Sequence, residues 1–383
     1  MVNRMILNET SYFGQGSIQS IVDEIQKRGF KKALLVTDKD LIKFSVATRV
    51  TDLLEKHDLP FAIYDGVIPN PSVDVVHAGV STFRDSGADY LIAVGGGSPQ
   101  DTCKAIGIMI ANPEYTDVRM LEGGAPTRNP SIPIIAVPTT SGTAAEVTIN
   151  YVITDEEKKR KFVCYDPHDI PVIAIIDPDM MSSMPAALKA ATGVDALTHA
   201  IEGYITRNAW ELTDMLHLKA IEIIGRSLRD SVKGVPSGVE DMALGQYIAG
   251  MGFSNVGLGL VHGMAHPLGA FYGTPHGIAN AVLLPHIMAF NAEYTGERYR
   301  KIARALGVKN VHSCPLPEAR ALAIDAVVRL NSDIGIPRRL RDIGMRLDDA
   351  DALAASAHAD VCTSGNPREC NVEQIAGLYR TLY

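Results

Sequence analysis

The first half of the chain alternates short, fully apolar runs with amphipathic segments. Five such runs predict strands: Ala33–Val36, Phe61–Tyr64, Leu91–Val94, Ile134–Val137 and Val172–Ile175. Continuously apolar strands are typical of a parallel sheet that is covered on both faces. The segment Ser17–Arg28 before the first run and the segment Ser72–Ser86 between the second and third have helical periodicity. The pattern therefore predicts an α/β fold for this half.

After Pro185 the strand-like runs stop. Segments rich in Ala, Leu, Ile and Met follow, and their apolar positions recur with helical spacing, as in Leu212–Leu228 and Pro317–Leu330. We expect this half to be entirely helical.

The length of 383 residues exceeds that of an ordinary single core and suggests two domains. Pro178 and Pro185 flank a plausible junction. We expect an α/β domain over residues 1–180 and an all-helical domain over residues 181–383.

Composition excludes several classes of partner. Hydrophobic residues make up 46% of the chain, yet no apolar run approaches the ~18 residues of a membrane span. The 36 basic and 44 acidic residues give a net charge of −8, which disfavours nucleic acid as a ligand. Because the first residues lack the apolar core of a secretory signal, we expect a cytoplasmic protein.

The five cysteines are odd in number and form no CxxC pair. This spacing disfavours a disulfide framework and a thiolate metal site, and we expect free thiols.

A glycine-rich loop follows the third predicted strand. Gly95, Gly96 and Gly97 lead into Ser98 and Pro99, which fit the N-cap and the first position of a helix. Glycines at the positive end of a helix leave room for a phosphate, so the loop suits a pyrophosphate. It matches neither GxGxxG nor GxxxxGK[ST], and a simple tight turn is the alternative.

Two further features fit a dinucleotide. The loop Pro138–Glu146 offers hydroxyls and amides after another predicted strand. Asp38 ends the strand that begins at Ala33, where a carboxylate accepts from ribose hydroxyls and repels a 2′-phosphate, which favours NAD over NADP. The alternative for Asp38 is a solvated turn residue.

The helical half carries candidate metal ligands in two clusters. Asp195 and His199 are spaced i, i+4, which places both on one helix face. His262 and His276 form the second cluster, with His266 between them. One carboxylate and three imidazoles suit a divalent first-row metal ion. Surface or hydrogen-bonded core histidines are the alternative, but the surroundings rich in Gly, Ala, Met and Leu make unpartnered imidazoles costly.

The ligand types do not fix the metal. A site of three histidines and one aspartate accepts Fe²⁺, Zn²⁺, Co²⁺ or Mn²⁺, and intrinsic affinity favours zinc over iron.

These motifs together resemble the iron-containing alcohol dehydrogenases. The segment from Ile176-Asp177-Pro178 to Gly193–Glu202 resembles the first signature of that family, and Gly259–Ala270 with His276-Gly277 resembles the second. The loops at Gly95–Ser98 and Pro138–Thr140 occupy matching places, and the resemblance covers essentially the whole chain. It implies the dehydroquinate synthase-like fold of this family, with a dinucleotide site on the parallel sheet and a metal site in the helical domain.

The resemblance also implies roles for single residues. The metal ligands would be Asp195, His199, His262 and His276, binding Fe²⁺ with Zn²⁺ as a possible substitute. The NAD contacts would be Asp38, Asn70, Gly96, Gly97, Ser98, Thr139, Thr140, Thr143, Asn150 and Lys161. The substrate pocket would be bordered by Asn150, Phe253, Leu258 and Cys362.

The implied activity is reversible hydride transfer between NADH and a small aldehyde, with a metal ion polarising the carbonyl. His266 is the candidate proton relay, and packing beside the metal is its alternative role. Segments such as Asn3–Thr10 and Met251–Leu260 are most similar to the subgroup that reduces lactaldehyde to 1,2-propanediol. The subgroup implies a homodimer formed partly through a strand around Met5–Leu7.

Three other activities remain open. Within the superfamily they are a zinc-dependent polyol dehydrogenase of the glycerol type and a broader short-chain primary alcohol dehydrogenase. Outside it, the alternative is a metal-dependent hydrolase or lyase that binds a nucleotide, which the paired cofactor loops disfavour.

Overall fold

A computed structural model describes residues 2–158 and 160–383, which form two compact units, Met1–Met184 and Pro185–Tyr383. In the N-terminal unit a six-stranded parallel sheet has the order β1-β8-β5-β4-β2-β3. Its strands are β1 (Thr10–Phe13), β2 (Ala33–Val36), β3 (Phe61–Tyr64), β4 (Tyr90–Gly95), β5 (Ile134–Pro138) and β8 (Ile173–Ile176). A separate antiparallel hairpin consists of β6 (Asn150–Asp155) and β7 (Arg160–Tyr165).

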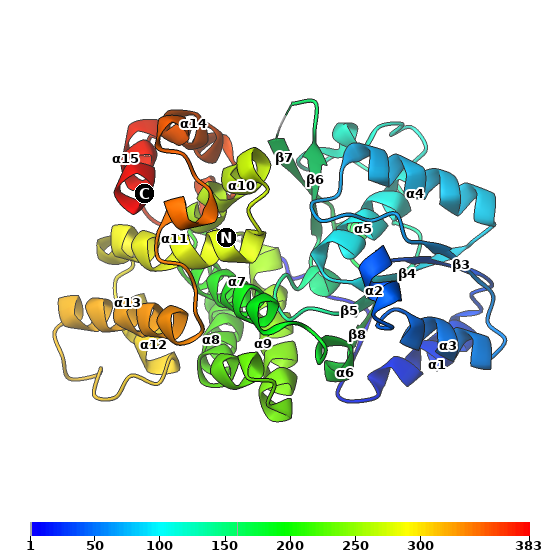
Figure 1. Cartoon of the computed structure of the whole chain (residues 1–383), viewed down its shortest axis with the longest axis horizontal. Helices are drawn as coiled ribbons and strands as arrows, with labels where there is room; N and C mark the ends of the chain where they lie inside the picture. Colours follow the sequence, from blue (N-terminus) through cyan, green and yellow to red (C-terminus); the bar gives the residue numbers. More distant parts are fainter. Residues whose placement is uncertain (1, 159) are drawn as a thin grey trace. The chain divides into compact units, whose positions relative to one another are not determined.

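Helices cover both faces of this sheet. They are α1 (Ser20–Arg28), α2 (Lys39–Lys43), α3 (Thr48–Lys56), α4 (Val73–Ser86), α5 (Gly97–Ala111) and α6 (Pro178–Met181). Leu34 and Val36 pack with α4 and α5, whereas Ala33 and Leu35 pack with α1 and α3 on the opposite face (Figure 1). Because neighbouring strand residues point to opposite faces, a continuously apolar run is what this double cover requires. The α/β prediction is confirmed.

All five predicted strands are present, but the sequence pattern missed three others. Strand β1 is a half-exposed edge strand with the sequence Thr-Ser-Tyr-Phe, so it lacks an apolar run. In β6 buried and half-buried residues alternate, as expected for a hairpin with one covered face. In this single chain Met5–Leu7 belong to no strand.

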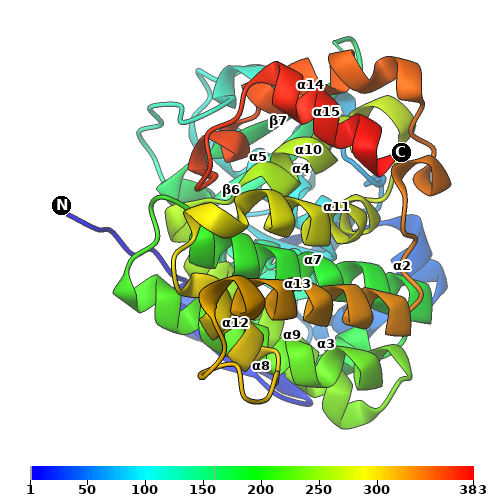
Figure 2. The same cartoon turned by 90° about the vertical axis from the view of Figure 1, so that its left-hand side faces the viewer.

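The C-terminal unit is helical, and no strand occurs between residues 185 and 383, all of which the structure describes. Its helices are α7 (Ala186–Ile205), α8 (Glu211–Val232), α9 (Pro236–Val256), α10 (Leu260–Tyr272), α11 (His276–Asn291), α12 (Arg298–Ala305), α13 (Leu316–Asp333), α14 (Ala350–Ala359) and α15 (Val372–Leu382). Helix α7 packs against α8, α9 and α11, and Figure 2 shows α11 above it and α8 and α9 below it. This central helix carries the first metal-ligand motif.

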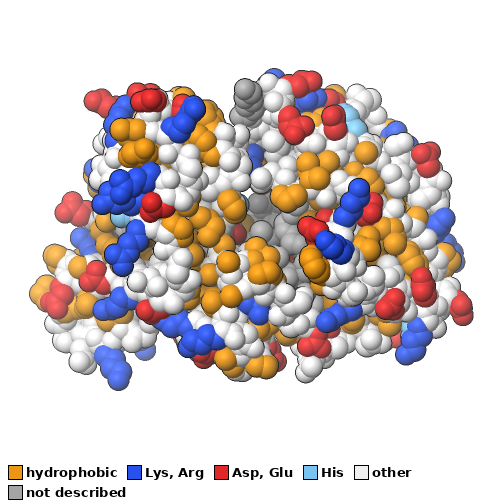
Figure 3. All heavy atoms as spheres, viewed as in Figure 1, with side chains coloured by type: hydrophobic (Ala, Val, Ile, Leu, Met, Phe, Trp, Pro, Cys, Tyr) orange, Lys and Arg blue, Asp and Glu red, His pale blue; other side chains and the backbone are white. Residues whose placement is uncertain are grey.

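No helix in the described part of the chain is both long and apolar enough to cross a membrane. On the face shown in Figure 3, acidic and basic side chains are interspersed. With a net charge of −8, such a surface gives no support for binding a polyanion.

Candidate metal centre and cofactor loops

Helix α7 presents Asp195 and His199 on one face, one turn apart. Both side chains are buried, with 2% of Asp195 and 5% of His199 exposed. The His199 ring stacks on Phe253 of α9, with 4.2 Å between the ring centroids. Stacking on Phe253 restricts the rotation of this imidazole.

Helices α10 and α11 supply the other imidazoles. His262 lies in the first turn of α10, His266 one turn later, and His276 is the first residue of α11. The start of α11 lies very close to α7, because a Cβ on Gly277 would come within 2.5 Å of the Ala191 carbonyl oxygen. Glycine at this position therefore allows His276 to approach Asp195.

The four predicted ligand side chains converge. Each of Asp195, His199, His262 and His276 offers an atom within 4.8 Å of the others. The Asp195 Oδ1 atom is 3.8 Å from His262 Nε2 and 3.6 Å from His276 Nε2. Donor atoms around a four-coordinate ion with bonds of about 2.1 Å are separated by roughly 3.4 Å. The donor set and its spacing therefore fit a divalent iron or zinc ion.

The buried carboxylate of Glu202 contacts Nδ1 of His262, the ring nitrogen that is not directed at Asp195. Glu202 Oε2 is 2.6 Å from His262 Nδ1, and Glu202 Oε1 accepts from the Val261 backbone N–H at 2.6 Å. Burial raises the pKa of Glu202 to about 8 when no metal is bound, while hydrogen bonds from backbone amides, and a cation held by His262, favour its carboxylate form. Burial also lowers the pKa of His262 well below its usual value, which keeps the ring neutral, the form that binds a metal. Such a carboxylate–histidine pair fixes ring orientation and tautomer.

The candidate relay His266 also has a carboxylate partner. Its Nδ1 lies 2.7 Å from Asp360 Oδ2, and Cys362 belongs to the same cluster of potential ligand atoms. Burial opposes ionisation of Asp360, but the adjacent His266 and the hydrogen bonds from Cys362 together lower the pKa of this carboxyl below its usual value. The ring of His266 stacks at 5.4 Å on that of His276. These two contacts therefore orient the His266 ring beside the four candidate metal ligands.

The predicted pocket residues of this unit lie around the same helices. Phe253 contacts His199, and Cys362 lies in the 3₁₀ helix η8 (Val361–Gly365) beside His266 and Asp360. Leu258 is buried, and its carbonyl oxygen lies against Gly365 of η8. The pocket assignment stays a prediction.

In the N-terminal unit the glycine loop leads into α5 as expected, with one correction. The helix begins at Gly97 with Gly96 as the N-cap, so the prediction of Ser98 as the N-cap and of Pro99 as the first helical position is wrong. The Ser98 hydroxyl instead accepts from the Asn70 backbone N–H at 3.3 Å. This hydrogen bond is a tertiary contact, because Asn70 lies 28 residues earlier in the chain.

The two predicted cofactor loops meet. A Cβ on Gly96 would come within 3.1 Å of Thr140, and one on Gly97 within 3.0 Å of Thr143. These glycines lie at the N-terminus of a 15-residue helix, where backbone N–H groups favour a phosphate. The absence of side chains here leaves a cradle that fits a pyrophosphate.

Asn70 and Lys161 also lie at this loop. The Lys161 ammonium donates to the Asn70 side-chain oxygen at 2.7 Å, and Asn70 has a left-handed backbone with φ of 57°. Nearby, the carbonyl of Asn150 accepts from the buried Lys104 at 2.9 Å. A lysine ammonium beside the start of α5 adds positive charge to the cradle.

Asp38 and Thr139 lie at the carboxyl ends of strands. Asp38 caps α2 by accepting from the Leu41 N–H at 2.8 Å through Oδ1. Thr139 directly follows β5, and its N–H donates to the Gly95 carbonyl at 3.1 Å. The carboxyl edge of the sheet therefore collects the predicted cofactor residues, as in other open α/β sheets.

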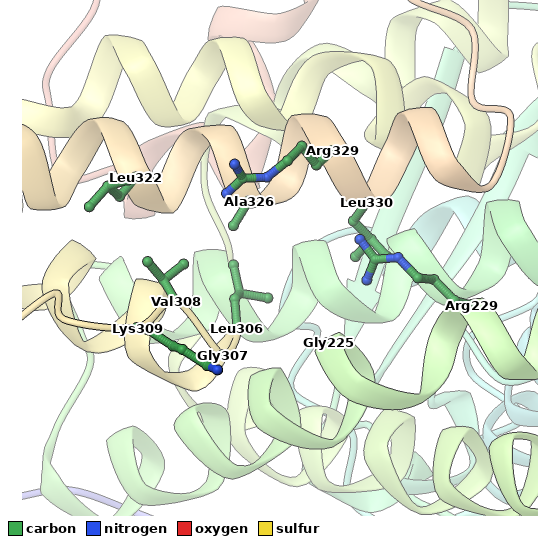
Figure 4. A pocket seen from close by; sticks show the side chains of 10 residues that line it. All are labelled: Gly225, Arg229, Leu306, Gly307, Val308, Lys309, Leu322, Ala326, Arg329 and Leu330. Carbon is green, nitrogen blue, oxygen red and sulfur yellow. The ribbon is translucent and has the colours of Figure 1, made fainter.

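A separate groove of about 350 Å³ lies between α8, α13 and the segment after α12 (Figure 4). Its lining includes the basic residues Arg229, Lys309 and Arg329 and apolar side chains such as Leu306 and Leu322. Because its lining contains no acid, histidine, cysteine or hydroxyl group, this groove offers no side chain suited to bind a divalent metal ion.

Sequence reasoning assigned no role to three residues that contact the ligand set or His266. Glu202 is seven residues after Asp195 on α7 and Asn280 is four after His276 on α11, so helical spacing gave a usable signal. Asp360 is 94 residues from His266, and no local pattern indicates that pair.

Comparison with known proteins agrees with this geometry. The model of the family "Iron-containing alcohol dehydrogenase" matches residues 8–178, and that of the "Fe-containing alcohol dehydrogenase family, C-terminal" matches residues 189–383. The chain is 66% identical over 383 residues to lactaldehyde reductase of Escherichia coli (strain K12), with 100% of both proteins covered.

Solved structures give the same result. That of a 1,3-propanediol oxidoreductase superposes with a TM-score of 0.97 at 41% identity, covering 100% of both chains. That of sulfoacetaldehyde reductase from Bifidobacterium kashiwanohense in complex with NAD⁺ superposes with a TM-score of 0.89 at 26% identity, covering 100% of this chain and 99% of the other. The chain belongs to the iron-containing alcohol dehydrogenase family.

Proposed function

We propose that this enzyme reduces lactaldehyde to 1,2-propanediol with NADH, reversibly, at an iron ion held by Asp195, His199, His262 and His276. The observation that carries the proposal is the convergence of these four side chains within 4.8 Å in a chain 66% identical to a lactaldehyde reductase along its whole length. No feature of the site favours a polyol substrate or a hydrolytic reaction.

The candidate ligands and the residues that contact them have different roles in this reaction. When bound, the metal supplies a Lewis acid for the aldehyde oxygen and NADH supplies the hydride. One carboxylate and three neutral imidazoles leave a divalent ion with a net positive charge, so the ligand set preserves its ability to polarise a carbonyl. Phe253 covers the face of His199, and Glu202 fixes His262.

Reduction consumes one proton besides the hydride, and His266 is the group positioned to supply it. The hydrogen bond to Asp360 holds Nδ1, so Nε2 is the ring nitrogen that would deliver the proton to the alkoxide formed by hydride transfer. Gly96 and Gly97 admit the pyrophosphate of NADH, and Asp38 is placed at the strand end to accept from its ribose.

The decisive experiment measures NADH oxidation with lactaldehyde under anaerobic conditions. Metal-stripped protein is reconstituted in parallel with Fe²⁺ and with Zn²⁺. Fast turnover with Fe²⁺ supports the proposal, and turnover with Zn²⁺ alone would replace iron by zinc. No turnover with either metal would remove lactaldehyde as the substrate.

Replacing His266 by alanine is expected to leave metal content unchanged and to lower kcat by about 10²- to 10⁴-fold, the usual contribution of a general acid. Metal analysis and steady-state kinetics check both halves of this statement. His286→Ala, at an exposed histidine of α11, serves as the control with wild-type rates. An unchanged kcat in His266→Ala would refute the relay.

Gly97→Val is expected to raise KM for NADH at least about tenfold, a loss of ~1.4 kcal/mol. The Cβ of a valine at this position would lie 3.0 Å from the Thr143 side chain. The valine methyl groups would occupy the space that we assign to the pyrophosphate. Titration of NADH fluorescence measures the effect directly. Gly377→Val, where a Cβ meets nothing within 4 Å, is the matched control. Equal NADH affinity in both variants would contradict the cradle.

We also propose a homodimer and a cytoplasmic location. The dimer is the assembly that the resemblance to the lactaldehyde-reducing subgroup implies, formed partly through the segment Met5–Leu7. All five cysteines are free, which suits a reducing compartment. A solution mass twice that of the 41.2 kDa chain would support the dimer, and a monomeric mass would exclude it.

A further inference from the structure

The side chain of Asn280 faces the metal-ligand cluster. Asn280 lies on α11 one turn after His276 and is completely buried. Its Nδ2 donates to Asp195 Oδ1 at 2.7 Å and lies 3.1 Å from Nε2 of both His262 and His276. One amide nitrogen therefore contacts three of the four candidate ligand side chains.

The chemistry of these neighbours fixes which end of the amide points to the site. With the amide reversed, its oxygen would lie 2.7 Å from a carboxylate oxygen, and two acceptors would repel each other. The NH₂ end must therefore face Asp195 and the imidazoles.

The side-chain oxygen of Asn280 is in an energetically unfavourable environment. Asn280 Oδ1 is buried and has no hydrogen-bond partner among the residues that the structure describes. A buried amide oxygen without a partner is destabilising, and an apolar residue of similar size would avoid the penalty. The favourable polar contacts of this side chain in the described structure are therefore those of its NH₂ group.

We propose that Asn280 is a positioning residue of the metal centre, which orients the Asp195 carboxylate while leaving Asp195 as the only anionic ligand. The role rests on the proposed metal site. Imidazole nitrogens that bind a cation cannot also accept a hydrogen bond, so the bond to Asp195 is the one that persists with metal bound. A restrained carboxylate loses less freedom when it binds the ion.

The neutrality of Asn280 is the second half of the role. A carboxylate at this position would bring a second negative charge to within about 3 Å of the ligand atoms. It would hold a divalent cation more tightly and reduce the positive charge that polarises a carbonyl. Metal affinity and turnover should therefore change in opposite directions.

The test uses Asn280→Leu and Asn280→Asp in the full chain. Zn²⁺ affinity is measured without substrate, by competition with a chromophoric chelator, and kcat is measured on the Fe²⁺ enzyme. We expect Asn280→Leu to bind Zn²⁺ about 10- to 100-fold more weakly. We expect Asn280→Asp to bind at least as tightly as the wild type while its kcat falls at least about tenfold.

Asn331 provides a matched control in the same unit. It is also buried, its Nδ2 donates to the Ala281 carbonyl at 2.8 Å, and its Oδ1 is likewise without a partner among the described residues. Asn331→Leu should keep wild-type Zn²⁺ affinity within about twofold, because Asn331 bonds to no candidate ligand.

The outcomes separate the possibilities. Wild-type affinity in Asn280→Leu, or equal weakening in Asn331→Leu, would reduce Asn280 to a structural residue. If Asn280→Leu does not fold, weaker binding or unchanged kcat in the isosteric Asn280→Asp would still overturn the proposal. If the wild-type chain binds no Zn²⁺, both the proposed metal centre and the proposed role of Asn280 are overturned. If it binds Zn²⁺ but does not reduce lactaldehyde, only the proposed substrate is overturned.

Discussion

Asp195→Ala is expected to purify with little bound metal and to lose at least about 10³-fold of its turnover with lactaldehyde. Asp195 is the only carboxylate in the four-residue cluster, and it is 2% exposed. Its removal leaves three neutral ligands, which bind a divalent ion more weakly. A Lewis acid contributes several kcal/mol to carbonyl reduction, and each ~1.4 kcal/mol corresponds to a tenfold change in rate.

The measurements are metal content after anaerobic purification and NADH oxidation at saturating Fe²⁺. Thr198→Ala is the control, because Thr198 lies on the same turn of α7, is buried, and its hydroxyl donates to the Val194 carbonyl at 2.8 Å. It should retain metal and rate. Normal metal content and rate in Asp195→Ala would show that the cluster is not the catalytic centre.

The parts of the fold that could be predicted are those in which a local pattern has one structural solution. Ala33–Val36 is apolar at every position because helices cover both faces of β2, and the predicted strand has the observed bounds. Asp195 and His199 share a helix face through their spacing alone. The glycine run before α5 likewise indicated a turn from a strand into a helix, and β4 ends at Gly95 where α5 begins at Gly97.

The parts that could not be predicted depend on distant contacts. Asp360 reaches His266 only through the packing of helices, and the 94 residues between them carry no signal of it. The N-cap of α5 is Gly96 and not Ser98, whose hydroxyl accepts a hydrogen bond from Asn70, a contact that no local pattern indicates. The edge strand β1 has too few apolar residues to be recognised before its partner β8 is known.

Glu202→Gln is expected to lower both metal affinity and stability. Glu202 accepts from the Val261 N–H and the His262 ring at 2.6 Å each, so both carboxylate oxygens face donors. A glutamine amide would turn an NH₂ group toward one of these donors. Leaving buried donors unpaired costs roughly 3 kcal/mol of unfolding free energy, and loss of a carboxylate behind a ligand histidine typically weakens metal binding 10- to 100-fold.

Glu24→Gln separates these two effects. Glu24 is a buried carboxylate of the N-terminal unit that accepts from the Tyr12 hydroxyl and from Arg28, each at 2.8 Å. Its substitution should destabilise the protein, as judged by urea unfolding, while Zn²⁺ affinity stays at the wild-type value. Equal loss of Zn²⁺ affinity in both variants would mean that metal binding follows global stability. A selective loss in Glu202→Gln would instead show that this carboxylate acts on the metal through the orientation of His262.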